Sequence, residues 1–183
     1  MDSEPHSVPK HVRFVELSAT ALRALADGDL AAGSAEAGVS LDEYFVSERA
    51  RSIFRYRADQ VTRDPSAAPW ITRAAVSEPD GVVIGDAGYH GPPDEDGVIE
   101  VGYCVVPRFR RQGHARAMLR SLLLRAAAEP GVRTVRATIG SDNAASLATI
   151  KGFGFTRVGE KGNETDGLAF VFEVPAEAIR TEP

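Results

Sequence analysis

Cysteine and histidine are scarce in this sequence. The 183-residue chain has one cysteine, Cys104, and four histidines, His6, His11, His90 and His114. A single cysteine cannot form an internal disulfide, and histidines this far apart lack the close spacing of a zinc site. The sequence therefore predicts a fold that its hydrophobic core holds together without a metal, in a reducing compartment.

Long apolar runs and an excess of positive charge are also absent. No uncharged apolar stretch approaches the about 20 residues that span a bilayer, and the acidic N-terminal segment MDSEPHSVPK lacks the apolar region of a secretory signal. These absences predict a cytoplasmic protein without a membrane partner. Lys and Arg number 21 against 26 for Asp and Glu, a formal charge of −5. Nucleic-acid binders usually carry the opposite balance, so the charge argues against a nucleic-acid partner and favours a cationic substrate.

The length and composition fit one domain of ordinary kind, with no internal repeat and no low-complexity linker. We expect residues 1–10 to be a disordered N-terminus, residues 11–176 to form a single domain, and residues 177–183 to form a C-terminal tail.

Along the chain, helix and strand patterns alternate. Residues 12–17 predict a strand, and Ser18 is a suitable N-cap for a helix that follows it. Residues 28–38 are rich in small side chains and predict a loop, and residues 40–62 predict one or two helices. Three strand-like runs follow at 69–77, 81–90 and 97–106, and a helix, a strand, a helix and two strands complete the chain. This order predicts a mixed α/β sheet with helices on its faces.

The segment 97–155 carries most of the information. The apolar strand GVIEVGYCVV ends at Pro107, and a helix follows whose apolar residues recur at i, i+3, i+4, i+7 and i+11: Ala115, Met118, Leu119, Leu122 and Ala126. Residues 132–139 alternate as the next strand, so a right-handed strand–helix–strand crossover is expected.

The loop before this helix has the features of an anion site. Gly113 and Ala115 allow close approach of the backbone, and the start of a helix carries about +0.5 of an elementary charge. Four arginines surround the loop: Arg108, Arg110, Arg111 and Arg116. A solvated turn is the alternative interpretation. No P-loop motif is present, and GFGFTRVG follows a helix, which is the wrong order for a dinucleotide fingerprint.

These motifs resemble a known family. The hexad RRQGHA at 110–115 resembles the [Q/R]-x-x-G-x-[G/A] signature of the GNAT N-acyltransferases, and SDNAASLATIKGFGF resembles the DN-x-x-S…GF segment of their RimJ/RimL-like branch, the ribosomal-protein N-terminal acetyltransferases. The resemblance covers roughly residues 80–174. It implies a GNAT fold: one mixed, mostly antiparallel sheet of about six or seven strands, a splayed parallel pair at the acetyl-CoA site, and helices on both faces.

The resemblance also implies where acetyl-CoA binds. The hexad loop would hold the pyrophosphate, and the end of the central strand would pair with pantetheine. The implied set is Cys104, Val105, Val106, Arg110, Arg111, Gln112, Gly113, His114, Ala115, Arg116, Asn143 and Ser146. The backbone amide of Cys104 would polarise the thioester carbonyl, while its thiol is expected to act as a small hydrophobe.

Two side chains are candidates for proton transfer. Glu100 is the expected general base, or else a strand-end carboxylate that faces water or pairs with arginine. It lies about 13 Å along the strand from Cys104, so water would relay the proton. Ser146 is expected to support or protonate the departing thiolate, or else to bond only helix backbone. Many family members have a tyrosine acid where this sequence has Ile150.

The predicted function is therefore acetyl-CoA-dependent N-acetylation. A primary amine, on a protein N-terminus or a small molecule, would attack the thioester directly through a tetrahedral intermediate, without a metal. A non-catalytic CoA-binding module is the alternative, and a homodimer remains open. Tyr44 on the early helices is expected to lie in the core or to roof the acceptor pocket. His90 is expected to be a surface residue, with a turn histidine near the acceptor cleft as the alternative.

Overall fold

In the computed structural model, which describes residues 10–78, 80–163 and 167–180, seven strands form one sheet in the order β1-β2-β3-β4-β5-β7-β6. The strands are β1 (His11–Val15), β2 (Arg73–Glu78), β3 (Val82–Tyr89), β4 (Val98–Val105), β5 (Thr134–Gly140), β6 (Thr156–Asn163) and β7 (Gly167–Pro175). Neighbouring strands are antiparallel except for β4 and β5, which are parallel. This confirms the predicted mixed, mostly antiparallel sheet with one parallel pair.

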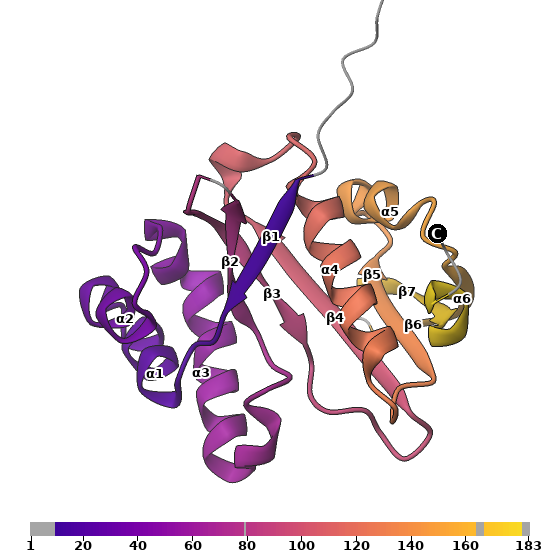
Figure 1. The fold of residues 1–183 in the computed structure, drawn as a ribbon, viewed down its shortest axis with the longest axis horizontal. Helices are drawn as coiled ribbons and strands as arrows, with labels where there is room; N and C mark the ends of the chain where they lie inside the picture. The colour runs from indigo at the N-terminus through magenta and orange to yellow at the C-terminus, as the bar shows by residue number, and fades with distance from the viewer. Residues whose placement is uncertain (1–9, 79, 164–166, 181–183) are drawn as a thin grey trace, which may run out of the picture.

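Five α-helices and three short 3-10 helices lie between the described strands, and a sixth α-helix follows β7 (Figure 1). The α-helices are α1 (Ala19–Asp27), α2 (Leu30–Ala37), α3 (Glu48–Arg63), α4 (His114–Ala128), α5 (Ala144–Ile150) and α6 (Ala176–Arg180), and the 3-10 helices are η1 (Glu43–Val46), η2 (Pro65–Ala67) and η3 (Pro107–Phe109). None of the helices described here is long and apolar enough to cross a membrane.

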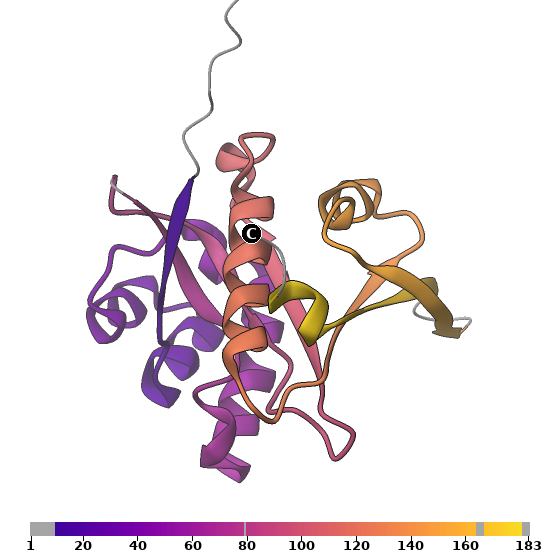
Figure 2. The same cartoon turned by 45° about the vertical axis from the view of Figure 1, so that its right-hand side comes forward.

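The helices cover both faces of the sheet, and the core accordingly has two parts (Figure 2). On one face, Val101 of β4 packs in a buried cluster with Met118 and Leu119 of α4. On the other face, a second cluster joins the sheet to α1, η1 and α3, with Phe45 and Phe54 stacked at 5.7 Å between ring centroids. The apolar stripe predicted for the helix after Gly113 is thus the buried side of α4.

Two predictions about local structure were wrong. Residues 28–38 are not a loop but contain α2, because Asp29 caps its first turn by accepting from the amide of Ala32 (2.9 Å), and alanine-rich segments favour helix. Residues 177–180, expected in the C-terminal tail, belong to α6, which begins at Ala176. The parts of the two predicted terminal segments at 1–9 and 181–183 lie outside the described residues.

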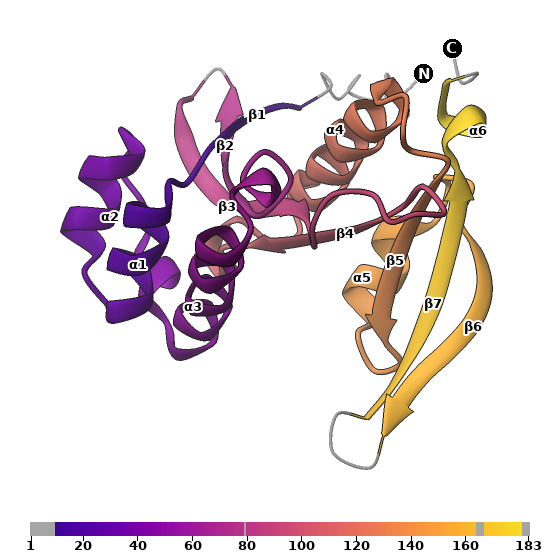
Figure 3. The same cartoon turned by 90° about the horizontal axis from the view of Figure 1, so that it is seen from below.

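The parallel pair separates along its length. Register pairing between β4 and β5 runs only from Val98↔Thr134 to Glu100↔Arg136, although each strand continues beyond it. Strand β5 stays paired with β7 along its whole length, whereas β4 stays paired with β3. Seen from below, β5, β6 and β7 turn away from β4 (Figure 3). We call the opening between the diverging halves of β4 and β5 the wedge.

Candidate active site

Successive residues of β4 direct their backbone amides alternately toward β3 and toward β5. At one end the amide of His90 donates to the carbonyl of Glu100 (2.9 Å), and at the other the amide of Val106 donates to the carbonyl of Ile84 (2.9 Å). The β3–β4 register between these bonds is unbroken. Since hydrogen-bonded pairs alternate in an antiparallel ladder, the amide of Cys104 is also directed toward β3.

The intervening residues of β4 therefore direct their amides toward β5. At the start of the same edge, the carbonyl of Gly97 accepts from Arg133 (2.8 Å) and Thr134 (3.2 Å). Tyr103 and Val105 lie beyond the last β4–β5 pair, so their amides face the wedge. Of the three residues expected to contact pantetheine, only Val105 has its amide on this edge. The amides of Cys104 and Val106 point toward β3. The side chain of Val106 is also buried.

The loop before α4 is shaped to receive an anion. Arg111 and Gly113 both have positive φ, +59° and +83°, and Arg111 is the one non-glycine residue in the described chain with this conformation. Alternating left- and right-handed residues direct successive amides into one concavity. No side chain caps α4 and no acid lies in its first turn, so its N-terminal amides stay available. A Cβ on Gly113 would meet nothing within 4 Å, which leaves the space in front of the loop open.

Most arginines of this loop fix the loop in place. Arg108 forms an ion pair with Asp42 before η1 (2.7 Å). Arg110 donates to the carbonyl of Val105 (3.0 Å), and Arg116 donates to two carbonyls at the end of α5, including that of Thr149 (3.0 Å). Their charge still surrounds the loop, but their geometry is set by these contacts.

His114 and Gln112 have contacts of their own. The ring of His114 is buried edge-on against Phe109, and burial lowers its pKa. The amide group of the Gln112 side chain donates to the carbonyl of Arg108 (3.1 Å). The Nδ1 atom of His114 is buried without a hydrogen-bond partner among the described residues. The side chain of Gln112 is engaged within the loop, so both residues offer a ligand their backbone amides.

A cavity of about 490 Å³ opens beside the loop. It runs from Gly113 along the outer side of α4, with Arg116 and Arg120 on its polar side and Phe153 and Ile179 on its apolar side. Its volume is within the range of small-molecule sites.

The face of the sheet beneath α3 carries a row of polar side chains. Register pairs Asp86 with Cys104, and beyond Gly88 and Gly102 the next residues on this face are His90, just after β3, and Glu100 of β4. Side chains two residues apart share a face, so these four groups line one surface. Within it, the hydroxyl of Tyr44 lies 3.0 Å from the Cys104 sulfur. We call this surface the polar row.

Side chains of η1 and α3 cover the polar row and contact its members. Arg49 of α3 lies 3.5 Å from the Cys104 sulfur, through its Nη1. Arg57 is buried and donates to the carbonyl of His90 (2.9 Å). Burial lowers the pKa of Arg57, while Tyr56 and the carboxylates of Asp86 and Glu100 oppose this effect. Tyr44 thus contacts the polar row.

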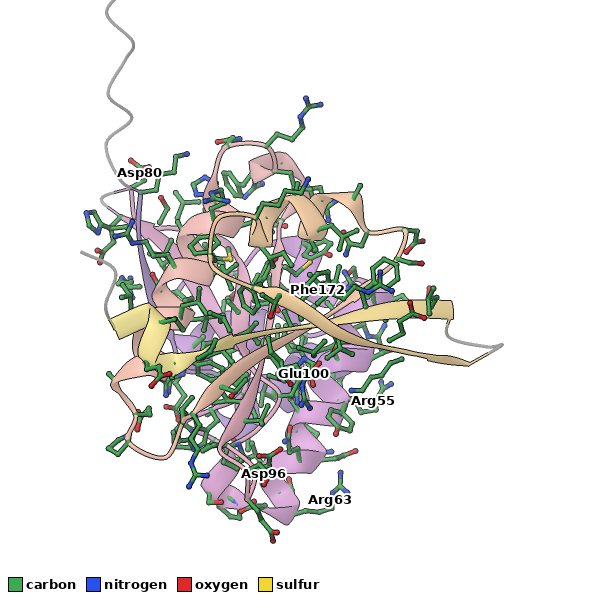
Figure 4. The ribbon with its side chains drawn as sticks, turned by 90° about the vertical axis from the view of Figure 1, so that its right-hand side faces the viewer. Arg55, Arg63, Asp80, Asp96, Glu100 and Phe172 are labelled. Atoms are coloured by element: carbon green, nitrogen blue, oxygen red, sulfur yellow. The ribbon has the colours of Figure 1, made fainter. Side chains whose placement is uncertain are left out.

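Glu100 is held by a partner. Its carboxylate lies 3.6 Å from Nδ1 of His90, and its side chain is only 20% exposed. In Figure 4, the Glu100 side chain lies near the middle of the molecule. Burial lowers the pKa of His90, and Glu100 raises it in part. His90, whose side chain is 50% exposed, is a surface residue as expected, and it also belongs to the polar row.

Asp86 was missed by the sequence analysis. Although part of the residue stays accessible to solvent, burial raises the pKa of its carboxyl to about 7, and Arg49 and Arg57 lower it in part. The signal in the sequence was a carboxylate within the apolar run VVIGDAGY, the same kind of signal that singled out Glu100.

On the opposite face, Tyr103 lies beside α5. Its hydroxyl is buried without hydrogen-bond geometry to a described partner, next to Ser146 and Thr149. Burial raises the pKa of Tyr103, and these two hydroxyls lower it in part. Asn143 caps α5 by accepting from the amide of Ser146 (3.1 Å), and Ile150 is buried in the core.

The match of this sequence to a family model decides its identity. A model described as "Acetyltransferase (GNAT) domain" matches residues 21–156. The chain belongs to the GNAT acetyltransferase family. It is accordingly an N-acetyltransferase, and acetyl-CoA is the cosubstrate of this family. An uncharacterized N-acetyltransferase of Bacillus subtilis, YjdG, is 32% identical over 73 residues, which are 40% of this chain and 44% of that protein, less than half its length.

Solved structures of GNAT acetyltransferases share the fold. A chimera of the spermidine N-acetyltransferase SpeG from Vibrio cholerae and hSSAT has a TM-score of 0.63 at 12% identity, over 96% of this chain and 100% of that one. A GNAT-family acetyltransferase from Bacillus anthracis has a TM-score of 0.60 at 14% identity, over 91% of this chain and 96% of that one. At these identities the likeness concerns the fold alone.

Proposed function

We propose that this GNAT acetyltransferase transfers the acetyl group of acetyl-CoA to a primary amine by direct attack in the wedge between β4 and β5. The observation that carries the proposal is the pair of amides, Tyr103 and Val105, that face the wedge just before the uncapped start of α4. One strand thereby supplies donors for a thioester chain, and the following loop supplies donors for its phosphates.

The amide of Tyr103 donates to the thioester oxygen, and the amide of Val105 pairs with pantetheine. The Tyr103 amide replaces that of Cys104 in the oxyanion role, because the alternation along β4 directs the Cys104 amide to β3. A backbone donor fixed in a strand stabilises the charge that develops on this oxygen during attack.

The loop at 110–116 binds the pyrophosphate through its backbone. Positive φ at Arg111 and Gly113 orients the amides, and the open space in front of Gly113 accommodates the phosphates. The neighbouring cavity, with Arg116 and Arg120 on one side and Phe153 on the other, suits the remaining nucleotide end of CoA.

Ser146 and Tyr103 assist the leaving thiolate. Both hydroxyls lie on the α5 side of β4, and the Tyr103 hydroxyl is buried there without a hydrogen bond to the described chain. The phenol of Tyr103 donates the proton that, in many relatives, comes from a tyrosine at the position of Ile150. Asn143 holds the first turn of α5 so that Ser146 is oriented.

The acceptor approaches from the polar row, on the face opposite α4. Its Arg49 and Arg57 favour an acceptor with one reacting amine and a neutral or anionic remainder over a polycation such as spermidine, the substrate named for the SpeG structures. A protein N-terminal α-amine, as in the RimJ/RimL branch, and a small amino-acid-like amine both meet this description.

An acceptor screen tests the proposal. Purified protein and acetyl-CoA are incubated with peptides of varied N-termini, amino acids and their amides, aminosugars and polyamines. Release of the CoA thiol is measured, and mass spectrometry locates the added acetyl group. We expect thiol release above the hydrolysis blank with α-amines or amino-acid-like amines; no release with any amine, from a folded protein, contradicts the proposal.

A further inference from the structure

The Asp86 carboxylate is the acid of the polar row that has no partner. Within the described part of the chain, no hydrogen bond or ion pair holds it, whereas Glu100 pairs with His90 at 3.6 Å and Arg57 is bonded to the His90 carbonyl. Part of the residue stays accessible to solvent, so the carboxylate is free to receive a group that the substrate supplies.

Asp86 also lies beside the reaction centre. It is the register partner of Cys104, the residue next to the proposed oxyanion donor Tyr103. Hydrogen-bonded partners of an antiparallel pair have Cα atoms about 5.5 Å apart. Glu100 is three residues from Tyr103, about 10 Å along the strand. Of the two carboxylates of the polar row, Asp86 has the shorter path to the acetyl group.

The charges around Asp86 set its protonation. Arg49 and Arg57 face it from α3, Tyr44 lies near it in η1, and His90 and Glu100, in contact with each other, lie further along the row. Burial raises its pKa to about 7, and the two arginines keep it from rising further. A base with a pKa near the operating pH combines a useful ionised fraction with the strength to accept a proton.

We propose that Asp86 binds the acceptor's ammonium group and accepts a proton from it, the role that the sequence suggested for Glu100. The proposal rests on the acetyl transfer proposed above. Asp86 takes one proton from R–NH₃⁺, the freed nitrogen forms a bond to the thioester carbon, and the C–S bond breaks. A second proton leaves the nitrogen as the amide forms, the thiolate ends as the CoA thiol with one proton, and Asp86 releases its proton to solvent. The acceptor class is a primary amine that is protonated at neutral pH.

Asp86→Asn, which keeps the shape and removes the charge, tests the proposal. With the best acceptor from the screen, kcat/KM is measured from pH 6 to 10 for the wild type, Asp86→Asn and the rival Glu100→Gln, and the Kd of acetyl-CoA is measured by calorimetry. Asp59→Asn, an exposed acid on α3, is the matched control. We expect Asp86→Asn to lower kcat/KM about 10²- to 10³-fold at pH 7, to recover above the pKa of the amine, and to keep the Kd for acetyl-CoA.

Three results overturn the proposal: a profile for Asp86→Asn that overlays the wild type, a loss that is constant with pH, or a larger and pH-dependent loss in Glu100→Gln. Asp86→Glu, which retains a carboxylate one methylene away, is expected to keep the pH dependence at a lower rate, and it serves if Asp86→Asn does not fold. Failure of the wild type to bind acetyl-CoA or to release CoA refutes the acetyl transfer itself, and so is distinct from failure of Asp86.

Discussion

Asp86 should make the folded protein less stable as the pH rises. Its pKa in the folded state is about 7, against 3.8 for a free aspartate side chain. Between these values the folded protein holds a proton that the unfolded chain has released, so stability falls with increasing pH. Three pH units at about 1.36 kcal/mol each give about 4 kcal/mol in full, of which roughly 2.5 kcal/mol falls between pH 5 and 8. Residual solvent access to the residue reduces this to about 2 kcal/mol.

Urea unfolding at a series of pH values measures this effect. We expect the stability advantage of Asp86→Asn over the wild type to grow by about 2 kcal/mol between pH 5 and pH 8, which is a shift of roughly 1 M in the urea midpoint for a domain of this size. Asp59→Asn removes an exposed ion pair with Arg23, so its effect should stay below about 1 kcal/mol. A difference between Asp86→Asn and wild type that does not change from pH 5 to 8 would show that the folded protein does not hold the carboxyl at a raised pKa.

Three further outcomes are expected. Gly113→Val should weaken acetyl-CoA binding at least tenfold by calorimetry, whereas Gly38→Val, which shares a positive φ and open surroundings, should leave it unchanged; equal Kd values in both would move the phosphate site elsewhere. Tyr103→Phe should lower kcat more than it raises the KM for acetyl-CoA, with Ser146→Ala having a smaller effect, and unchanged kcat in both would leave water as the proton donor. Arg49→Ala should lower the KM for spermidine about five- to tenfold, since roughly 1 kcal/mol of like-charge repulsion is removed, and an unchanged KM would separate Arg49 from the acceptor.

The fold was predictable because its strongest signals are local. The alternation at 132–139 and the apolar stripe after Gly113 both reflect burial on one side of an element, and the structure buries those sides. The helix α2 was missed because its small residues give almost no apolar stripe, and its caps at Asp29 and Gly38 are equally common in loops. Helix α6 was missed because it has only five residues.

The candidate site was less predictable because it depends on register. The phosphate loop could be located from Gly113 and the start of a helix, since both are local features. The assignment of an oxyanion amide required knowing which edge of β4 each residue faces, and the choice between Cys104 and Tyr103 depends on a shift of one residue. Asp86 lies in another strand, 18 positions before Cys104, and only the pairing of β3 with β4 brings the two together.

The alternation of β4 also explains how the groups for three separate tasks can meet around one short strand. In a strand, backbone amides point to the two edges in turn, while side chains point to the two faces in turn. Tyr103 therefore directs its amide into the wedge and its hydroxyl toward α5, and the flanking positions Gly102 and Cys104 face the polar row with Asp86. In the proposed mechanism the oxyanion donor, the amide of Tyr103, lies at the edge of β4. The acid, the hydroxyl of Tyr103, lies on one face of the sheet, and the base, Asp86, lies on the opposite face. The acid and the base are separated by the sheet itself, so a proton taken by Asp86 cannot pass directly to Tyr103. The proton that Asp86 takes must leave through solvent at the polar row, and the supply of a proton to the thiolate remains independent of it.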